Sequence, residues 1–97
     1  MRLDPGALEF EWDRGNVGKN KKHGVEDFEG EEAFFDGRKV LLRDIPHSKG
    51  EERFILLGKT KGGRLLFVVF TKRARRIRII SARNVNQKEK PLYEEAP

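Results

Sequence analysis

Residues 65–70 form an unbroken apolar run, Leu-Leu-Phe-Val-Val-Phe, directly after the segment Lys61-Gly62-Gly63-Arg64. A short apolar run bounded by a turn is typical of a strand, and because its side chains leave on both sides, both of its faces must be covered. Paired glycines supply the positive φ angles that tight hairpins require. The run is therefore predicted to be the central strand of a sheet, joined by a hairpin to the strand before it.

Three more strands are predicted around this central one, over residues 40–42, 53–57 and 77–81. The first two are separated by the turn-forming segment Pro46-His47-Ser48-Lys49-Gly50 and are expected to pair antiparallel. In the last one, alternation directs Ile77 and Ile79 to one face and Arg76 and Arg78 to the other.

The part of the chain before Arg38 carries helical signals, apart from a short strand predicted over residues 9–12. Asp13 is placed to cap a helix over residues 14–23, which Gly15 and Gly18 weaken and Gly24 closes. A second helix is predicted over residues 26–35. Its apolar members are Phe28, Ala33, Phe34 and Phe35, and its acidic residues Glu29, Glu31 and Glu32 are expected to face water as a solvated surface.

The C-terminal segment, residues 86–95, is predicted to be a short helix. Asn86 and Glu89 have the spacing of a capping box, but Pro91 costs a regular helix one hydrogen bond, so this helix should be kinked, short or loosely held.

The length of 97 residues allows one core, so we expect a single α+β domain over residues 1–97, with about 1–8 and 94–97 loosely ordered. The chain has no cysteine, which excludes disulfides and thiolate chemistry. No apolar stretch approaches the roughly 20 residues that span a bilayer, and the N-terminus lacks the apolar core of a signal peptide. A soluble cytoplasmic protein without a membrane partner is expected.

Charge is distributed unevenly along the sequence. Residues 1–52 hold 9 basic and 13 acidic groups, a net charge of −4, whereas residues 53–97 hold 12 basic and 3 acidic groups, a net charge of +9. A positive charge of this density on a short, strand-rich segment attracts polyanions, and nucleic acid is the first candidate. Solvation of an outer sheet face is the alternative interpretation.

Several motifs occur together in one order. They are Phe10-Glu11-Trp12-Asp13, Asn20 with Lys22-His23-Gly24-Val25, Phe28 and Ala33, Asp44, His47-Ser48, Gly50-Glu51-Glu52-Arg53-Phe54, Val68-Val69-Phe70-Thr71, Arg76-Ile77-Arg78-Ile79-Ile80-Ser81-Ala82-Arg83, Glu89 and Tyr93. In these motifs the sequence resembles the BrnT family of toxins, small relatives of the RelE ribonucleases. The resemblance implies a RelE-like α+β fold with a short N-terminal strand, two helices, a four-stranded antiparallel sheet and a short C-terminal helix.

The resemblance also implies a function. The expected protein is the toxin of a type II toxin–antitoxin system, an endoribonuclease that slows translation by attack of a ribose 2′-hydroxyl on the adjacent phosphate, without metal or other cofactor. Its expected partners are RNA and a DNA-binding, BrnA-like antitoxin, with which it is expected to form a heterotetramer.

Candidate site residues follow from what this chemistry needs: cations for the phosphate and groups that move protons. Arg78 and Arg83 lead, because a guanidinium fork matches two phosphate oxygens, and Arg53 and Arg64 come next. The other candidates are Tyr93, for base stacking or a phosphate contact unless it only packs against the sheet, and His47 and Glu52, for proton transfer. RNA-binding positions are predicted at Arg64, Lys72, Arg73, Arg75 and Arg76.

Two histidines 24 positions apart do not resemble a metal-ligand set, so no metal site is predicted. His23, at a helix end, is interpreted as structural. Two other functions stay open: a module that binds RNA or ribosomes without cutting, and an interaction protein whose basic face meets an acidic antitoxin.

Overall fold

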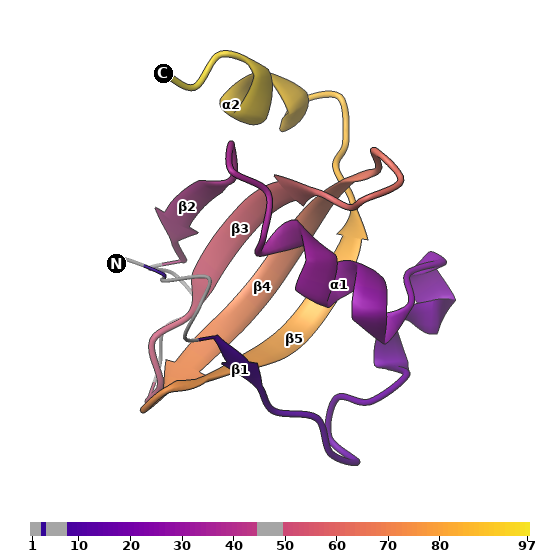
Figure 1. The fold of residues 1–97 in the computed structure, drawn as a ribbon, viewed down its shortest axis with the longest axis vertical. Coiled ribbons are helices and arrows are strands. Elements are labelled where there is room, and N and C mark those ends of the chain that lie inside the picture. The colour runs from indigo at the N-terminus through magenta and orange to yellow at the C-terminus, as the bar shows by residue number, and fades with distance from the viewer. Residues whose placement is uncertain (1–2, 4–7, 45–49) are drawn as a thin grey trace.

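The computed structural model describes residue 3, residues 8–44 and residues 50–97, which form a five-stranded sheet with a helix across one face (Figure 1). The strands are β1 (Glu9–Phe10), β2 (Val40–Arg43), β3 (Phe54–Lys59), β4 (Leu65–Arg73) and β5 (Arg76–Asn84), in the spatial order β1-β5-β4-β3-β2. The α+β class and the central place of residues 65–70 are confirmed. The predicted turn over residues 46–50 falls mostly outside the described residues.

The sheet is larger than predicted, because β1 joins it as a fifth strand. β1 pairs parallel with β5, whereas the other three pairings are antiparallel. Glu9 lies opposite Arg76 and Phe10 opposite Ile77, and the backbone N–H of Glu11 donates to the carbonyl of Ile77 at 2.9 Å. The four-stranded antiparallel sheet was therefore wrong in one strand. A two-residue strand carries no local signal of its distant partner.

The hairpin between β3 and β4 forms where the paired glycines predicted it. The backbone N–H of Thr60 donates to the carbonyl of Arg64 at 2.9 Å, and that of Gly63 donates to the carbonyl of Thr60 at 2.9 Å. Gly63 has φ +86°, a conformation that residues with a Cβ rarely adopt. The turn thereby fixes the register of the two central strands.

A β-bulge in β5 decides which way its last residues point. Val69 pairs with Ser81 and Phe70 with Ile79, so Ile80 is an extra residue. Ile79 and Ala82 are both fully buried although three positions separate them. Strict alternation from Ile79 would have pointed Arg83 toward the core, but the bulge returns it to the face that carries Arg78.

The first predicted helix, over residues 14–23, was wrong in extent: only Lys19–His23 is helical, as the 3-10 helix η2. Asp13 is not its cap; its Oδ1 accepts a hydrogen bond from the N–H of Gly15 at 2.7 Å within a turn. Gly18 has the left-handed conformation, with φ +68°, so the helical conformation can begin only after it, in η2. Gly24, at φ +72°, closes the helix as predicted.

Helix α1 (Asp27–Ala33) is shorter than predicted and turns a different face to the sheet. Of the four apolar members named from the sequence, Ala33 and the following Phe34 are fully buried, but Phe28 and Phe35 are 60% and 51% exposed. Small residues explain the difference: a Cβ on Gly58 of β3 would lie 2.4 Å from the carbonyl oxygen of Ala33. Glycine here lets the α1 backbone approach β3 closely.

The core lies between α1 and the inner face of the sheet. Edge-to-face contacts connect Phe34 to Phe10 and to Phe70, with ring centroids 5.3 Å and 4.9 Å apart. The buried residues of this cluster are Leu3, Val25, Ala33, Phe34, Leu56, Leu66, Val68, Phe70, Ile77, Ile79 and Ala82. The face of the sheet that carries Arg78 and Arg83 is called the outer face below.

Helix α2 (Lys90–Glu94) begins later than predicted, after the capping box. The N–H of Asn86 donates to Glu89 Oε1 at 3.0 Å, and the N–H of Glu89 donates to Asn86 Oδ1 at 2.9 Å. Pro91 lies in the first turn, where backbone N–H groups have no acceptor within the helix. A proline there removes no helical hydrogen bond and does not kink the helix.

Candidate functional site

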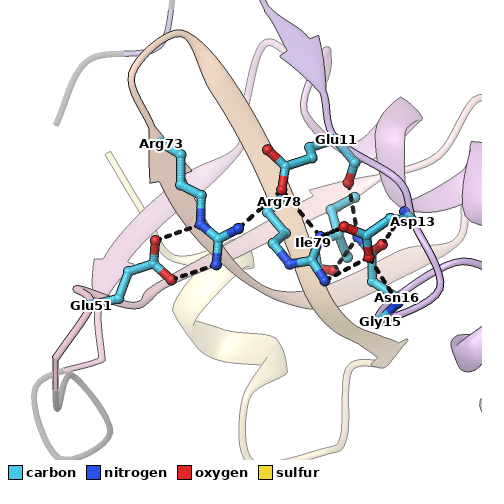
Figure 2. A network of polar contacts seen from close by, with 8 residues as sticks. All are labelled: Glu11, Asp13, Gly15, Asn16, Glu51, Arg73, Arg78 and Ile79. Atoms are coloured by element: carbon cyan, nitrogen blue, oxygen red, sulfur yellow. Dashed lines mark hydrogen bonds and ion pairs between the residues drawn. The ribbon is translucent and has the colours of Figure 1, made fainter.

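Arg78, a predicted catalytic residue, and Arg73, a predicted RNA-binding residue, meet three carboxylates at the β1–β5 side of the outer face (Figure 2). These five residues are called the arginine–carboxylate network. Arg73 donates to Glu51 at 2.7 Å and 3.1 Å and to Glu11 at 3.0 Å. Arg78 donates to the same Glu11 oxygen at 3.2 Å and to both oxygens of Asp13 at 2.9 Å. Charges of opposite sign therefore alternate from Glu51 to Asp13.

The strand register places these arginines together. In β4 and β5, Thr71 lies opposite Arg78, and Arg73 lies opposite Arg76, on the outer face. Ile77 and Ile79 take the core positions and are fully buried, as their alternation predicted. Three arginines therefore share one end of the face.

Arginine contacts favour the charged forms of Asp13 and Glu51. The hydrogen bonds from Arg78 lower the pKa of Asp13, and those from Arg73 lower the pKa of Glu51. The same contacts raise the pKa of Arg73, chiefly through Glu51, and of Arg78, chiefly through Asp13. With two cations and three anions, the network carries a net charge of −1 at neutral pH. A phosphate that binds here must compete with carboxylates.

Asn16, which the sequence did not single out, holds the network in place. Its side chain is 1% exposed and donates to the carbonyls of Glu11 and Ile79 at 2.9 Å and 3.0 Å, while its Oδ1 accepts from the N–H of Asp13 at 2.8 Å. Neighbouring Gly15 leaves room for Arg78, since a Cβ there would lie 2.4 Å from a guanidinium nitrogen. The signal available in the sequence was an Asn within the turn-forming segment Gly15-Asn16-Val17-Gly18.

Arg83 lies on the outer face, five positions after Arg78 along β5 and so roughly 15 Å away at the usual rise per residue. It donates to both oxygens of Glu89 at 2.8 Å and 2.7 Å, and its guanidinium stacks 4.1 Å from the centre of the Phe67 ring. These hydrogen bonds raise the pKa of Arg83 and lower that of Glu89. Arg83 is thus a fixed cation with one planar face held by an aromatic ring.

Tyr93 is 9% exposed, and its hydroxyl donates to Asp36 Oδ2 at 2.6 Å. The backbone N–H groups of Lys59 and Arg38 also donate to Asp36, at 2.8 Å and 2.9 Å. Burial, and then the hydrogen bond to Asp36, raise the pKa of Tyr93 to about 12. The geometry agrees with the packing interpretation of Tyr93, which ties α2 to the segment after α1.

The remaining candidates are dispersed. Arg64 donates to Glu29 at 3.0 Å and 3.1 Å, so Glu29 does not simply face water as predicted. Glu52 pairs with Arg43 at 3.1 Å. The other candidates are placed as follows: Arg76 lies 3.7 Å from Glu9, Lys72 and Arg75 are exposed, the half-buried Arg53 accepts at its carbonyl from Asp44, and His47 lies outside the described residues.

His23 has a structural contact, since its Nδ1 lies 3.1 Å from the carbonyl oxygen of Ala82 and so connects η2 to β5. In the part of the chain that the structure describes, no group of three His, Asp or Glu side chains is arranged to hold a metal ion.

An open cleft of about 770 Å³ lies beside the network, and it is lined by Leu41, Leu42, Arg43, Gly50, Glu51, Glu52, Phe54 and Lys72. It brings Glu52 and Lys72 of the predicted set next to Glu51 of the network. Two carboxylates, Glu51 and Glu52, and two cations, Arg43 and Lys72, therefore share one cleft.

Comparison with protein families identifies the family of the chain. The model of the family "Ribonuclease toxin, BrnT, of type II toxin-antitoxin system" matches residues 12–89. The chain belongs to the BrnT family. No curated protein matches the sequence. The BrnT match includes Arg73, Arg78 and Arg83 but ends before Tyr93. Among the described residues, no helix is long and apolar enough to cross a membrane.

Proposed function

We propose that this BrnT-family protein cleaves RNA on the outer face of its sheet, without a metal ion, and thereby inhibits translation. The observation that carries the proposal is the bulge at Ile80, because it brings Arg83 to the face that already holds Arg73 and Arg78. Guanidinium groups on one face can contact several phosphates of a single strand, with Arg73 and Arg78 at one phosphate and Arg83 at a phosphate further along. In this proposal Arg76, Lys72 and Arg75 add attraction at the hairpin end.

In the proposed reaction, the 2′-oxygen of a ribose bonds to the adjacent phosphorus, the bond to the 5′-oxygen breaks, and the products are a 2′,3′-cyclic phosphate and a 5′-hydroxyl. One group accepts the proton of the 2′-hydroxyl and another donates a proton to the leaving oxygen. Arg73 and Arg78 stabilise the negative charge that builds on the phosphate oxygens. This reaction class requires no electron transfer.

Glu51 is the proposed base. Hydrogen bonds from Arg73 lower its pKa in the free protein. When Arg73 turns to a phosphate oxygen, Glu51 loses these bonds, its pKa rises toward the ordinary value, and it becomes a stronger base beside the phosphate. Glu52 and His47, which the sequence nominated for proton transfer, are the candidates for the second group.

The proposed setting is cytoplasmic, and the proposed inhibitor is a BrnA-like, DNA-binding antitoxin in a heterotetramer. Membership of the BrnT family supports an antitoxin partner. Growth after expression of the toxin alone and together with its antitoxin tests this part: a toxin arrests growth and its antitoxin restores it.

The test of cleavage uses purified protein, freed of antitoxin, with RNA in EDTA. The single variants Arg78→Ala and Arg83→Ala are expected to cleave about 10- to 100-fold more slowly, because each loses a charge-assisted contact. Arg38→Ala is the matched control, since it removes one exposed arginine whose N–H contact to Asp36 is made by the backbone. Glu51→Gln should lower the rate but not the RNA affinity.

Each alternative has its own result. Cleavage that needs added Mg²⁺ would contradict the metal-free reaction, and an unchanged rate in both arginine variants would remove the outer face from the mechanism. RNA binding without cleavage would favour a binding module or a ribosome-dependent enzyme. Unchanged cleavage by His47→Ala would exclude His47.

A further inference from the structure

Two aromatic side chains on α1 and just after it stay in water. Phe28 is 60% exposed and Phe35 is 51% exposed, although burial of a phenylalanine stabilises a fold. Single exposed apolar residues are ordinary, but two that line the same groove indicate a surface that another molecule covers.

The groove lies between α1 and the β3–β4 hairpin and has a volume of about 650 Å³. Its lining residues are Phe28, Glu31, Glu32, Phe35, Asp36, Lys59, Thr60 and Lys61. Its acidic members are fixed: Trp12 donates to Glu31 at 2.5 Å, and the N–H of Lys61 donates to Glu32 at 3.1 Å. The groove is thus pre-formed, with aromatic side chains between ordered carboxylates.

Charge favours a protein segment over RNA as the occupant. The groove is lined by Glu31, Glu32 and Asp36 on its α1 side and by Lys59 and Lys61 on its hairpin side. Residues 26–36, which include the α1 side, contain six acidic residues and no basic one. Helix α1 covers the inner face of the sheet (Figure 1). By the strand register, the arginine–carboxylate network and Arg83 lie on the outer face. The acidic α1 side of the groove repels a polyanion, whereas a protein segment with apolar residues flanked by Lys or Arg is complementary to it.

We propose that this groove is the anchoring site of the cognate antitoxin, which inserts an apolar segment flanked by basic residues between α1 and the β3–β4 hairpin. The proposal rests on the family's antitoxin partner and not on the chemistry of RNA cleavage. Affinity for the antitoxin is then separate from the RNA-binding face. A toxin that loses the groove escapes its inhibitor but keeps its activity.

The experiment compares Phe28→Ser/Phe35→Ser with the wild-type protein. Leu92→Ser is the matched control, because Leu92 is 49% exposed and does not line the groove. The probe is the full-length antitoxin encoded beside the toxin, titrated by calorimetry. The double variant should bind about 100-fold or more weakly, since central aromatic anchors dominate protein interfaces, and Leu92→Ser should bind like the wild type.

Glu32→Gln provides a second test that leaves the aromatic residues in place. It keeps an oxygen to accept from Lys61 and removes one charge, so antitoxin affinity should fall a few-fold at low salt and less at high salt. Cleavage of RNA without antitoxin is measured for every variant and should not change. If the wild-type protein does not cleave RNA, the proposed reaction is refuted, but the comparison of antitoxin binding among the variants still tests the groove.

Three results would overturn the anchoring site. They are antitoxin binding by the double variant within threefold of the wild type, an equal loss of binding in Leu92→Ser, and a wild-type dimer that the double substitution converts to a monomer. The last result would assign the groove to a second copy of this protein. Thermal unfolding of each variant confirms that a loss of binding is not a loss of folding.

Discussion

Replacing Tyr93 with phenylalanine separates packing from a role in RNA cleavage. The ring and its burial remain, and only the hydroxyl that donates to Asp36 at 2.6 Å is removed. A hydrogen bond to a charged group contributes about 1.5–3 kcal/mol. Asp36 keeps its backbone donors from Lys59 and Arg38, so we expect a loss of about 2 kcal/mol in the free energy of unfolding, without loss of the fold.

The pH dependence gives a second measure of the same contact. The pKa of Tyr93 is raised from 10.0 to about 12, so the folded protein holds this proton more tightly than the unfolded chain. This contribution is complete below pH 10 and is lost as the pH rises from 10 to 12. Linkage gives a loss of about 1.3 kcal/mol between pH 9 and pH 11, which Tyr93→Phe should not show.

The assay is urea unfolding of both proteins at pH 7, 9 and 11. Lysines titrate in both proteins, so the difference between the two isolates Tyr93. Because Tyr93 is the only tyrosine, the absorbance of its phenolate reports its pKa directly. Equal stability of the two proteins at pH 7, combined with loss of RNA cleavage in Tyr93→Phe, would refute the packing role and place the hydroxyl in the reaction.

Two glycines give further predictions. Gly58→Ala should lower the free energy of unfolding by about 3 kcal/mol, because its Cβ would meet the backbone oxygen of Ala33. Gly62→Ala, the control in the same urea experiment, should change it by less than about 0.5 kcal/mol. Equal effects of the two substitutions would contradict the close approach of α1 to β3. Gly15→Ala should displace the flexible end of Arg78. We expect the free energy of unfolding to change by less than about 1 kcal/mol and RNA cleavage to slow about tenfold. An unchanged cleavage rate would show that cleavage does not depend on the position of Arg78.

Local signals were sufficient for the antiparallel strands. The Gly62-Gly63 turn and the apolar run of residues 65–70 act over a few positions, and the structure has both where they were predicted. The N-terminal elements depended on distant contacts. Asn16 binds the carbonyl of Ile79 across 63 positions, and no periodicity of the sequence reports that bond.

The candidate site was predictable as a set of residue types but not as a geometry. Charge counting identified Arg73 and Arg78, whereas their carboxylate partners come from segments that fold back from the other half of the sequence. The position of Arg83 required a bulge that alternation does not reveal. Phe28 was assigned to the apolar members of the helix, but it is exposed. The sequence does not show that Gly30 and Ala33 supply the contact face of α1.

The carboxylates of the arginine–carboxylate network have a physical reason to be there. Arg73 and Arg76 lie directly opposite each other across the strands, and like charges in that position destabilise a sheet. In the free protein Glu11 and Glu51 pair with Arg73, and Glu9 lies 3.7 Å from Arg76, so carboxylates offset this repulsion. Glu11 and Asp13 also hold the guanidinium group of Arg78 in place. A phosphate that replaces them meets arginines already arranged, but only the difference between the two sets of contacts contributes to affinity. If the proposed function is correct, we expect this face to bind RNA moderately and to release its products readily, which suits repeated cleavage better than tight binding.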